Sequence, residues 1–251
     1  MIRTLKIIKH QGKQFIPDLQ QVNLPDIHTG KPLIAEYPCK ADCAVCRELC
    51  PTQAISIQPV TIDMGRCVFC RECTVCSEKI ISFSNEYKIA SNDPELLKVT
   101  AGTENINFNS DFIRKEIQHF FGGSLKLRLV SDGSCNGCEL ELNAADNVNF
   151  DMSRYGVEFV ASPRHADGLV VTGALVENSI RALELTYEAI PAPKILIALG
   201  ACAISGGIFQ NSKTLNCSLF EKHKPDLYIP GCPPHPLTII NGILTLIGKS
   251  K

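Results

Sequence analysis

The sequence lacks the features that several large classes of protein require. It has no run of about 18 apolar residues, the length that a membrane-spanning helix needs, and its longest apolar-rich runs, 195–204 and 239–247, are interrupted by Gly, Cys, Asn or Thr. Lys and Arg number 25 and Asp and Glu 26, so the basic excess of a nucleic-acid-binding protein is missing. The first twenty residues contain no apolar core of the kind found in secretory signal peptides, and we expect none. No Gly-rich nucleotide loop and no hydrolase triad pattern is present.

Tryptophan is also absent, and aromatic residues make up only 6% of the chain. The 251 residues are nevertheless 45% hydrophobic and 20% charged, which is enough apolar material for a packed core and is not the composition of a disordered chain. This length leaves room for one large domain or two small ones.

What the sequence has in excess is cysteine. Of its 13 cysteines, eight lie between residues 39 and 76, and the other five are spread over the second half of the chain. Disulfides are rare in proteins that stay in a reducing compartment. Without an export signal, metal binding is the main reason to keep so many thiols together.

The cysteine pattern and the composition divide the chain into four segments. Residues 1–33 contain several prolines and no sustained periodicity, so we expect an extended arm with little helix. Residues 34–90 hold the dense cysteines, and short strands are predicted within them at 54–58 and 80–83.

Residues 91–120 are predicted to connect this cysteine-rich segment to the rest of the chain. The stretch 91–110 is polar, as linkers are. Asp111 is then predicted to cap a helix with one apolar face, and Gly122 and Gly123 are predicted to end it.

Residues 121–251 alternate short β-branched runs with helical stretches. This order predicts an α/β domain of the flavodoxin-like type, with a parallel sheet and helices on both of its faces. The predicted strands are 125–130, 157–161, 168–173, 195–200 and 226–231, and the predicted helices are 139–148, 177–190 and 236–248.

Two cysteine runs in the cysteine-rich segment have the spacing of iron–sulfur ligands. Residues 39–51 read CKADCAVCRELCP, or C-x3-C-x2-C-x3-C-P, and residues 67–76 read CVFCRECTVC, or C-x2-C-x2-C-x2-C. A cubane cluster needs four thiolates, and a tight loop supplies three of them while the fourth comes from further away. Each run resembles the bacterial ferredoxin run C-x2-C-x2-C-x3-C-P, in which the fourth cysteine binds the other cluster.

This resemblance implies a small α+β bacterial ferredoxin-like domain with two 4Fe–4S clusters. The first cluster would be bound by Cys39, Cys43, Cys46 and Cys76, and the second by Cys67, Cys70, Cys73 and Cys50. The first run has one residue more than the ferredoxin pattern before Cys43, and the second has one fewer before Cys76. Two structural zinc sites are the alternative, because C-x2-C pairs also build zinc ribbons.

Four further cysteines each follow the carboxyl end of a predicted strand. Cys135 and Cys138 lie in SCNGCELE, Cys202 in GACAISGG and Cys232 in GCPPHP. Open α/β sheets bind ligands at this edge, so the four thiols would form a site for a third cubane cluster. Four buried cysteines of an ordinary core are the alternative.

These motifs carry a specific resemblance. C-N-G-C-E, S-P-R-H-A-D, G-A-C-x3-G-G and P-G-C-P-P-H-P, in this order, resemble the small subunit of membrane-associated nickel–iron hydrogenases of the formate-hydrogenlyase and energy-converting type. The same module is similar to the 20 kDa cluster subunit of respiratory complex I. The resemblance covers about residues 120–248, and the ferredoxin resemblance covers about 30–90. Cys135 and Cys138 are three apart, as in the hydrogenases, whereas the complex I subunit has two adjacent cysteines there.

The resemblance implies an electron-relay subunit with three 4Fe–4S clusters, which passes electrons between a redox donor and the nickel–iron site of a hydrogenase large subunit. The chain has no second pair of C-x-x-C motifs for nickel, so we expect no activity from it alone. Implied partners are that large subunit and membrane-arm subunits, which would hold the chain at the cytoplasmic face of the membrane. The alternatives are a quinone-reducing subunit of a complex I-like enzyme and a stand-alone ferredoxin carrier.

A few other residues near these motifs are candidates for a role. Glu139 and Glu141 would either relay protons or stabilise a helix N-terminus. Arg164 and His165 would either lie near a cluster or belong to a surface loop. Cys217 is left over from the quartets and is expected to be an ordinary thiol. No paired metal spacing is seen at His10, His28, His119, His223 and His235.

Overall fold

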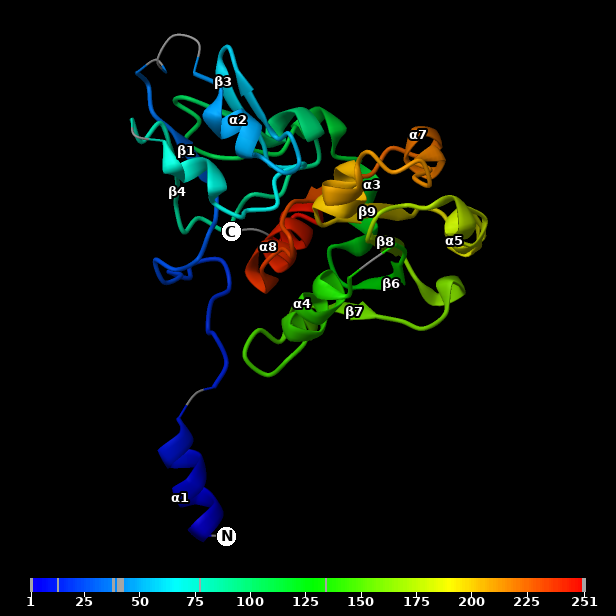
Figure 1. The fold of residues 1–251 in the computed structure, drawn as a ribbon. Helices are drawn as coiled ribbons and strands as arrows, with labels where there is room; N and C mark the ends of the chain where they lie inside the picture. Colours follow the sequence, from blue (N-terminus) through cyan, green and yellow to red (C-terminus); the bar gives the residue numbers. More distant parts are fainter. Residues whose placement is uncertain are drawn as a thin grey trace.

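The computed structural model describes residues 2–12, 14–37, 39, 43–76, 78–133 and 135–249. It contains a cysteine-rich part formed by residues 32–100, a larger α/β part formed by the chain that follows, and helix α1 (Ile2–Gln11), which stands away from both (Figure 1).

The α/β part is built on a parallel sheet of five strands in the order β10-β9-β8-β6-β7. Val170 of β8 pairs with Leu129 of β6 and with Ile197 of β9, and every residue of β8 and β9 is buried, as in central strands that are covered on both faces. The predicted parallel sheet is thereby confirmed. The strands are β6 (Leu125–Ser131), β7 (Val157–Phe159), β8 (Gly168–Thr172), β9 (Ile195–Leu199) and β10 (Leu227–Ile229).

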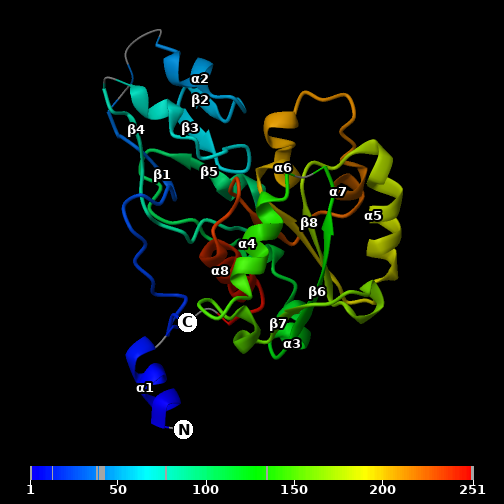
Figure 2. The ribbon, with the colours of Figure 1, turned by 60° about the horizontal axis from the view of Figure 1, so that its bottom comes forward.

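Helices cover both faces of this sheet (Figure 2). Side chains alternate along β8, so Val170 packs into one core with Leu142, whereas Leu169 and Val171 pack into a second core with Leu183. The first core is covered by α3 (Lys115–Phe121), α4 (Gly137–Ala145) and α8 (Pro236–Leu246), and the second by α5 (Glu177–Ala189) and α7 (Ser218–Lys222).

The cysteine-rich part consists of two strand–helix–strand units. The outer strands β1 and β4 pair antiparallel, and the inner strands β2 and β3 pair antiparallel. The strands predicted at 54–58 and 80–83 are β2 and β4. Strands β1 and β3 were not predicted, since one begins at Pro32 and the other directly after Pro59, and proline argues against a strand. The elements are β1 (Pro32–Ile34), α2 (Val45–Leu49), β2 (Ile55–Ile57), β3 (Val60–Asp63), η1 (Glu72–Val75) and β4 (Ile81–Phe83).

The polar segment expected to be a linker is an integral part of the fold. Its strand β5 (Lys98–Thr100) pairs with β3, and Ser91 and Tyr228 exchange two backbone hydrogen bonds of 3.1 and 2.8 Å. Met64, Leu97 and Tyr228 share a buried cluster, which fixes the cysteine-rich part against the sheet. The expectation of a linker at 91–110 is therefore wrong at this point, because the buried Leu97 and Val99 interrupt the polar stretch.

Two further local expectations are wrong. Residues 2–11 form helix α1 instead of an extended arm, because all the prolines of the arm lie beyond it and Gly12, at φ 64°, ends it. Asp111 caps no α-helix: the Asn109 side chain accepts a hydrogen bond from Asp111 N, which places Asp111 inside the 3-10 turn η3 (Ser110–Phe112). Helix α3 begins at Lys115, later than the expected start after Asp111, and Gly122 caps its end as expected. None of the helices in the described ranges is long and apolar enough to span a membrane.

Candidate metal centres

The thiols of the first predicted quartet surround a common cavity. Cys46 lies on α2, Cys76 follows η1, and Cys39 and Cys43 lie between β1 and α2. Together they line a cavity of ≈ 220 Å³ whose remaining walls are apolar. Desolvation and the three neighbouring thiols raise the pKa of Cys39. The apolar residues of this cavity are Val45, Val60, Val75, Ile80 and Ile81.

Two thiols of the second predicted quartet, Cys67 and Cys73, are buried, whereas Cys50 is half-buried and Cys70 is exposed. Burial, with the nearby thiols of Cys73, Cys50 and Cys70, raises the pKa of Cys67 to about 12. Burial raises the pKa of Cys73 to about 11, and Cys70 and Cys50 add to this effect. As free thiols, Cys67 and Cys73 are therefore protonated at neutral pH, and they would release protons on binding a metal.

Backbone donors point at two of these sulfurs. Phe69 N donates to Cys67 Sγ and Ala54 N donates to Cys50 Sγ, both at 3.3 Å. A backbone N–H that donates to sulfur favours the thiolate over the thiol, and such bonds raise the potential of a bound cluster. These two hydrogen bonds would partly replace the water that the Cys67 and Cys50 thiolates lose.

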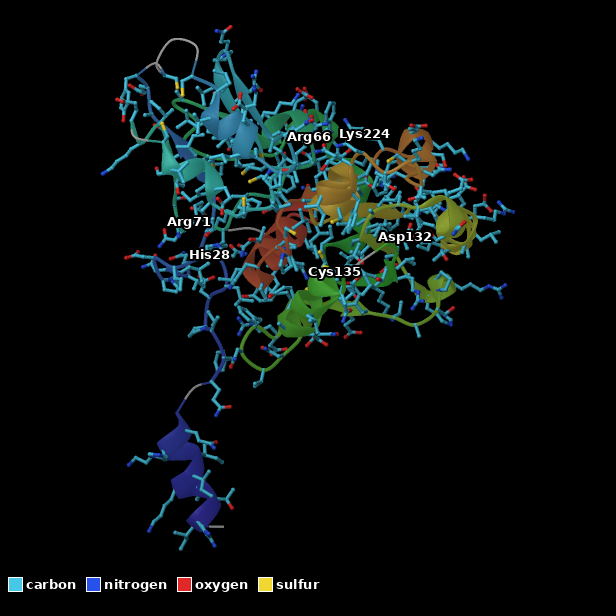
Figure 3. The ribbon with its side chains drawn as sticks, in the orientation of Figure 1. His28, Arg66, Arg71, Asp132, Cys135 and Lys224 are labelled. Atoms are coloured by element: carbon cyan, nitrogen blue, oxygen red, sulfur yellow. The ribbon has the colours of Figure 1, made fainter. Side chains whose placement is uncertain are left out.

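The third predicted quartet gathers at the carboxyl edge of the parallel sheet. Cys135 precedes α4, Cys138 lies on α4, Cys202 lies on α6 (Ala201–Ser205) after β9, and Cys232 follows β10. Figure 3 marks Cys135 where the chain passes from β6 to α4. Burial raises the pKa of Cys138 to about 12, with contributions from Glu139 and from the other three thiols. Burial also raises the pKa of Cys202 to about 11, and Cys232 and Cys135 add to it.

Glycine lets the backbone come close to these thiols. Gly200 has φ 90°, and a Cβ at this position would lie 2.6 Å from Cys138 Sγ. A Cβ at Gly207 would lie 3.0 Å from Cys202 Sγ. Four thiols that follow three strands and lie close together, with the backbone of Gly200 and Gly207 next to two of them, fit the donor set of an iron–sulfur cluster. Within the described residues, no three His, Cys, Asp or Glu side chains are placed to hold a single metal ion.

The three quartets also lie next to one another. Cys46 of the first quartet contributes to the raised pKa of Cys73 in the second. Cys70 of the second quartet contributes to the raised pKa of Cys232 in the third. The second quartet therefore adjoins both of the others.

Glu139 and Glu141 differ in their surroundings. Glu139 is only 8% exposed and accepts a hydrogen bond from the Thr172 hydroxyl of β8. Glu141 lines a cavity of ≈ 240 Å³ beside Cys232, and burial raises its pKa. Their role in proton transfer stays a prediction.

The same cavity contains two histidines that the sequence did not single out. The rings of His28 and His235 lie 5.2 Å apart, and burial lowers the pKa of His235 to about 4. His235 Nδ1 accepts a hydrogen bond of 3.1 Å from Leu237 N and so caps α8. No short motif joins His28 to His235, because they meet only through the fold.

The remaining candidates lie elsewhere. Cys217 is exposed at the start of α7 and belongs to no quartet. Arg164 and His165 are exposed on the 3-10 turn η5 (Pro163–His165), which packs against α5 and β6. Three other histidines lie on or beside helices: His10 on α1, His119 on α3 and His223 after α7.

The region that matches known proteins includes the third quartet. The profile of the family described as NADH ubiquinone oxidoreductase, 20 Kd subunit, matches residues 135–246, a range that contains Cys135, Cys138, Cys202 and Cys232. A "Probable membrane-bound hydrogenase subunit" of Pyrococcus furiosus is 43% identical over 130 residues, which are 52% of this chain and 78% of that protein. This chain belongs to the family of the NADH ubiquinone oxidoreductase 20 Kd subunit. The expected resemblance to the hydrogenase small subunit and the complex I 20 kDa subunit is thereby confirmed. The cysteine-rich part lies outside the profile match, so its resemblance to bacterial ferredoxins stays a prediction.

Other relatives carry names from both branches of the family. Formate hydrogenlyase subunit 7 of Escherichia coli is 42% identical over 120 residues, 47% of each chain. An NADH-quinone oxidoreductase subunit of Geotalea daltonii is 38% identical over 117 residues, 45% of this chain and 68% of that protein. Family membership therefore agrees with an oxidoreductase subunit and does not by itself choose between a hydrogenase and a quinone reductase.

Proposed function

We propose that this chain is the electron-relay subunit of a membrane-associated, hydrogenase-type oxidoreductase. It would hold three 4Fe–4S clusters, which would pass electrons between a redox donor and the nickel–iron site of a large partner subunit. One observation carries the proposal: the twelve cysteines lie in three groups, and in each group neighbouring thiols raise the pKa of at least one member, namely Cys39, Cys67 and Cys138. The second group adjoins both of the others.

Each quartet would hold one cluster, which when bound supplies one-electron transfer. Cys39, Cys43, Cys46 and Cys76 would hold the first cluster, and Cys67, Cys70, Cys73 and Cys50 the second. Cys135, Cys138, Cys202 and Cys232 would hold the third. The apolar walls of the first site and the burial of Cys67 and Cys73 in the second would limit the access of water to these thiolates.

The cysteine-rich part would be a ferredoxin-like domain. Its two strand–helix–strand units, with β1 paired to β4 and β2 paired to β3, give one loop and one fourth cysteine to each site and support this proposal. The buried cluster around Leu97 and Tyr228 would keep this domain at a fixed distance from the third site.

The partner would supply the nickel. After three quartets, only Cys217 is left of the 13 cysteines, and it is too far from any motif to make a nickel site. Cys135 and Cys232 are exposed, so the third site opens on a surface that a large subunit can cover and keep dry. The spacing of Cys135 and Cys138 favours a hydrogenase partner. The chain would then be peripheral on the inner face of the cytoplasmic membrane.

A quinone-reducing subunit of a complex I-like enzyme is the second candidate. It is favoured by the similarity to the NADH-quinone oxidoreductase subunit of Geotalea daltonii, of which this chain covers 68%. In that case the third site would face a quinone-binding partner that contains no nickel.

The two candidates are separated by purifying the native complex through a tag on this chain. We expect a nickel-containing partner and hydrogen-dependent reduction of a dye, with neither property in the chain alone. A nickel-free complex that reduces quinone would replace the hydrogenase proposal with the complex I-like one.

A further inference from the structure

Helix α1 has no buried residue and lies apart from the rest of the described chain. Figures 1 and 2 show it on the far side of an extended segment, away from the sheet and from the cysteine-rich part. Isolated helices of fewer than about 12–15 residues are marginal in water, and α1 has ten residues. A surface outside this chain is therefore needed to stabilise it.

The side chains of α1 separate into two faces. With 3.6 residues per turn, Leu5, Ile7 and Ile8 fall on one side, together with the uncharged Thr4 and Gln11. These three side chains are 59%, 48% and 57% exposed. The opposite side carries only basic residues and one apolar residue: Arg3, Lys6, Lys9, His10 and Ile2.

The charge of residues 2–17 indicates what kind of surface α1 contacts. Residues 2–17 contain no Asp or Glu, although the whole chain is nearly neutral. A groove on a protein would use the apolar face and leave the basic face without a partner. A bilayer uses both, because the apolar face enters the acyl boundary while lysine and arginine reach the phosphates.

We propose that α1 lies in the surface of a membrane that contains anionic lipid. Leu5, Ile7 and Ile8 would face the acyl chains, and Arg3, Lys6 and Lys9 would bind lipid phosphates. The chain would thus contact the membrane directly, in addition to any contact through partner subunits.

The short connection between Gly12 and Ile16 determines which side of the molecule would face the bilayer. Gly12 N closes the helix onto Ile8 O at 3.1 Å, and Ile16 N already donates to Asn149 O at 2.8 Å. Arg154 donates to Ile16 O at 2.6 Å. Next to this attachment, Val148 is 65% exposed. The loop 147–155 would therefore lie on the membrane side.

The test measures binding of the full chain, with its clusters, to two kinds of vesicle. One contains equal parts of phosphatidylglycerol and phosphatidylcholine, and the other only phosphatidylcholine. We expect cosedimentation with the anionic vesicles, loss of binding at high salt, and little binding to the neutral ones. A wild-type chain that does not bind the anionic vesicles overturns the proposal.

Variants assign the binding to the two faces. Lys6→Gln with Lys9→Gln should weaken binding roughly 30-fold, and Leu5→Gln with Ile8→Gln should also weaken it. Ile27→Gln is the matched control, because Ile27 is 83% exposed outside α1. If the α1 variants bind vesicles like the wild type, α1 does not bind the membrane and the proposal is wrong. If they also lose partner subunits, the surface that α1 contacts belongs to a protein.

A second readout follows insertion itself. The chain has no tryptophan, so Ile8→Trp introduces a single tryptophan on the apolar face of α1, which can be excited apart from the tyrosines. Its emission should shift to the blue with anionic vesicles, whereas that of Ile27→Trp should not change. An unshifted spectrum for Ile8→Trp would show that the apolar face stays in water and would contradict the proposal.

Discussion

Replacing Gly200 by alanine should remove the third cluster and leave the other two intact. A Cβ at this position would lie 2.6 Å from Cys138 Sγ, whereas ordinary contacts of carbon are about 3.5–4.0 Å. The sulfur must therefore move by about 1 Å, which exceeds the tolerance of about 0.2 Å for a metal–ligand distance. The backbone adds about 1–3 kcal/mol of strain, because Gly200 has φ 90° and ψ 154°, a region that is nearly exclusive to glycine.

The control separates strain from contact. Gly102 has φ 80° and no atom within 4 Å of a Cβ, so Gly102→Ala should cost stability without touching a cysteine. We expect Gly200→Ala to lose about four of about twelve irons and one set of paramagnetic resonance signals, and Gly102→Ala to lose none. Full iron content in Gly200→Ala, or equal iron loss in both variants, would refute the reasoning.

Three further variants test other parts of the assignment. Cys217→Ser should leave the iron content and electron transfer unchanged, and a loss of about four irons would mean that the quartets are misassigned. Cys76→Ser should damage one cluster of the cysteine-rich part, and an unchanged iron content would show that Cys76 is no ligand. Since the pKa of His235 is lowered to about 4, the unfolded chain binds protons more tightly than the folded chain, and stability is lost as the pH falls from about 6.5 to 4. His235→Asn keeps an acceptor for Leu237 N and should reduce this loss in denaturation curves at about pH 7 and 5, whereas an equal loss would contradict it.

The larger part of the fold could be predicted from the sequence. The strands of the α/β part are short apolar runs between glycines and helical stretches, and their alternation allows few arrangements other than a parallel sheet. This is why all five strands were found with errors of at most two residues at an end. The third quartet followed directly, since each of its cysteines comes after one of these strands.

What could not be predicted depends on contacts between distant residues. Strand β5 forms because Val99 pairs with Ile62 and is buried there, and no feature of residues 91–110 predicts that partner. The backbone hydrogen bonds between Ser91 and Tyr228 could not be predicted for the same reason. Helix α1 was missed because it has no acidic residue in its first turn and three prolines follow it within residues 1–33.

The grouping of the first eight cysteines came from a resemblance and not from spacing alone. Spacing shows that each run is compact, but not that Cys50 would face the second run and Cys76 the first. The structure places Cys76 in the cavity with Cys39, and Cys50 beside Cys67. Whether all four thiols of each group bind iron is a separate, chemical question.

Metal analysis of the anaerobically purified chain tests the central claim most directly. Three quartets of cysteines that each hold a four-iron cluster predict about twelve irons and as many sulfides per chain, and no zinc. A chain that contains only zinc, or only about four irons, would contradict the account.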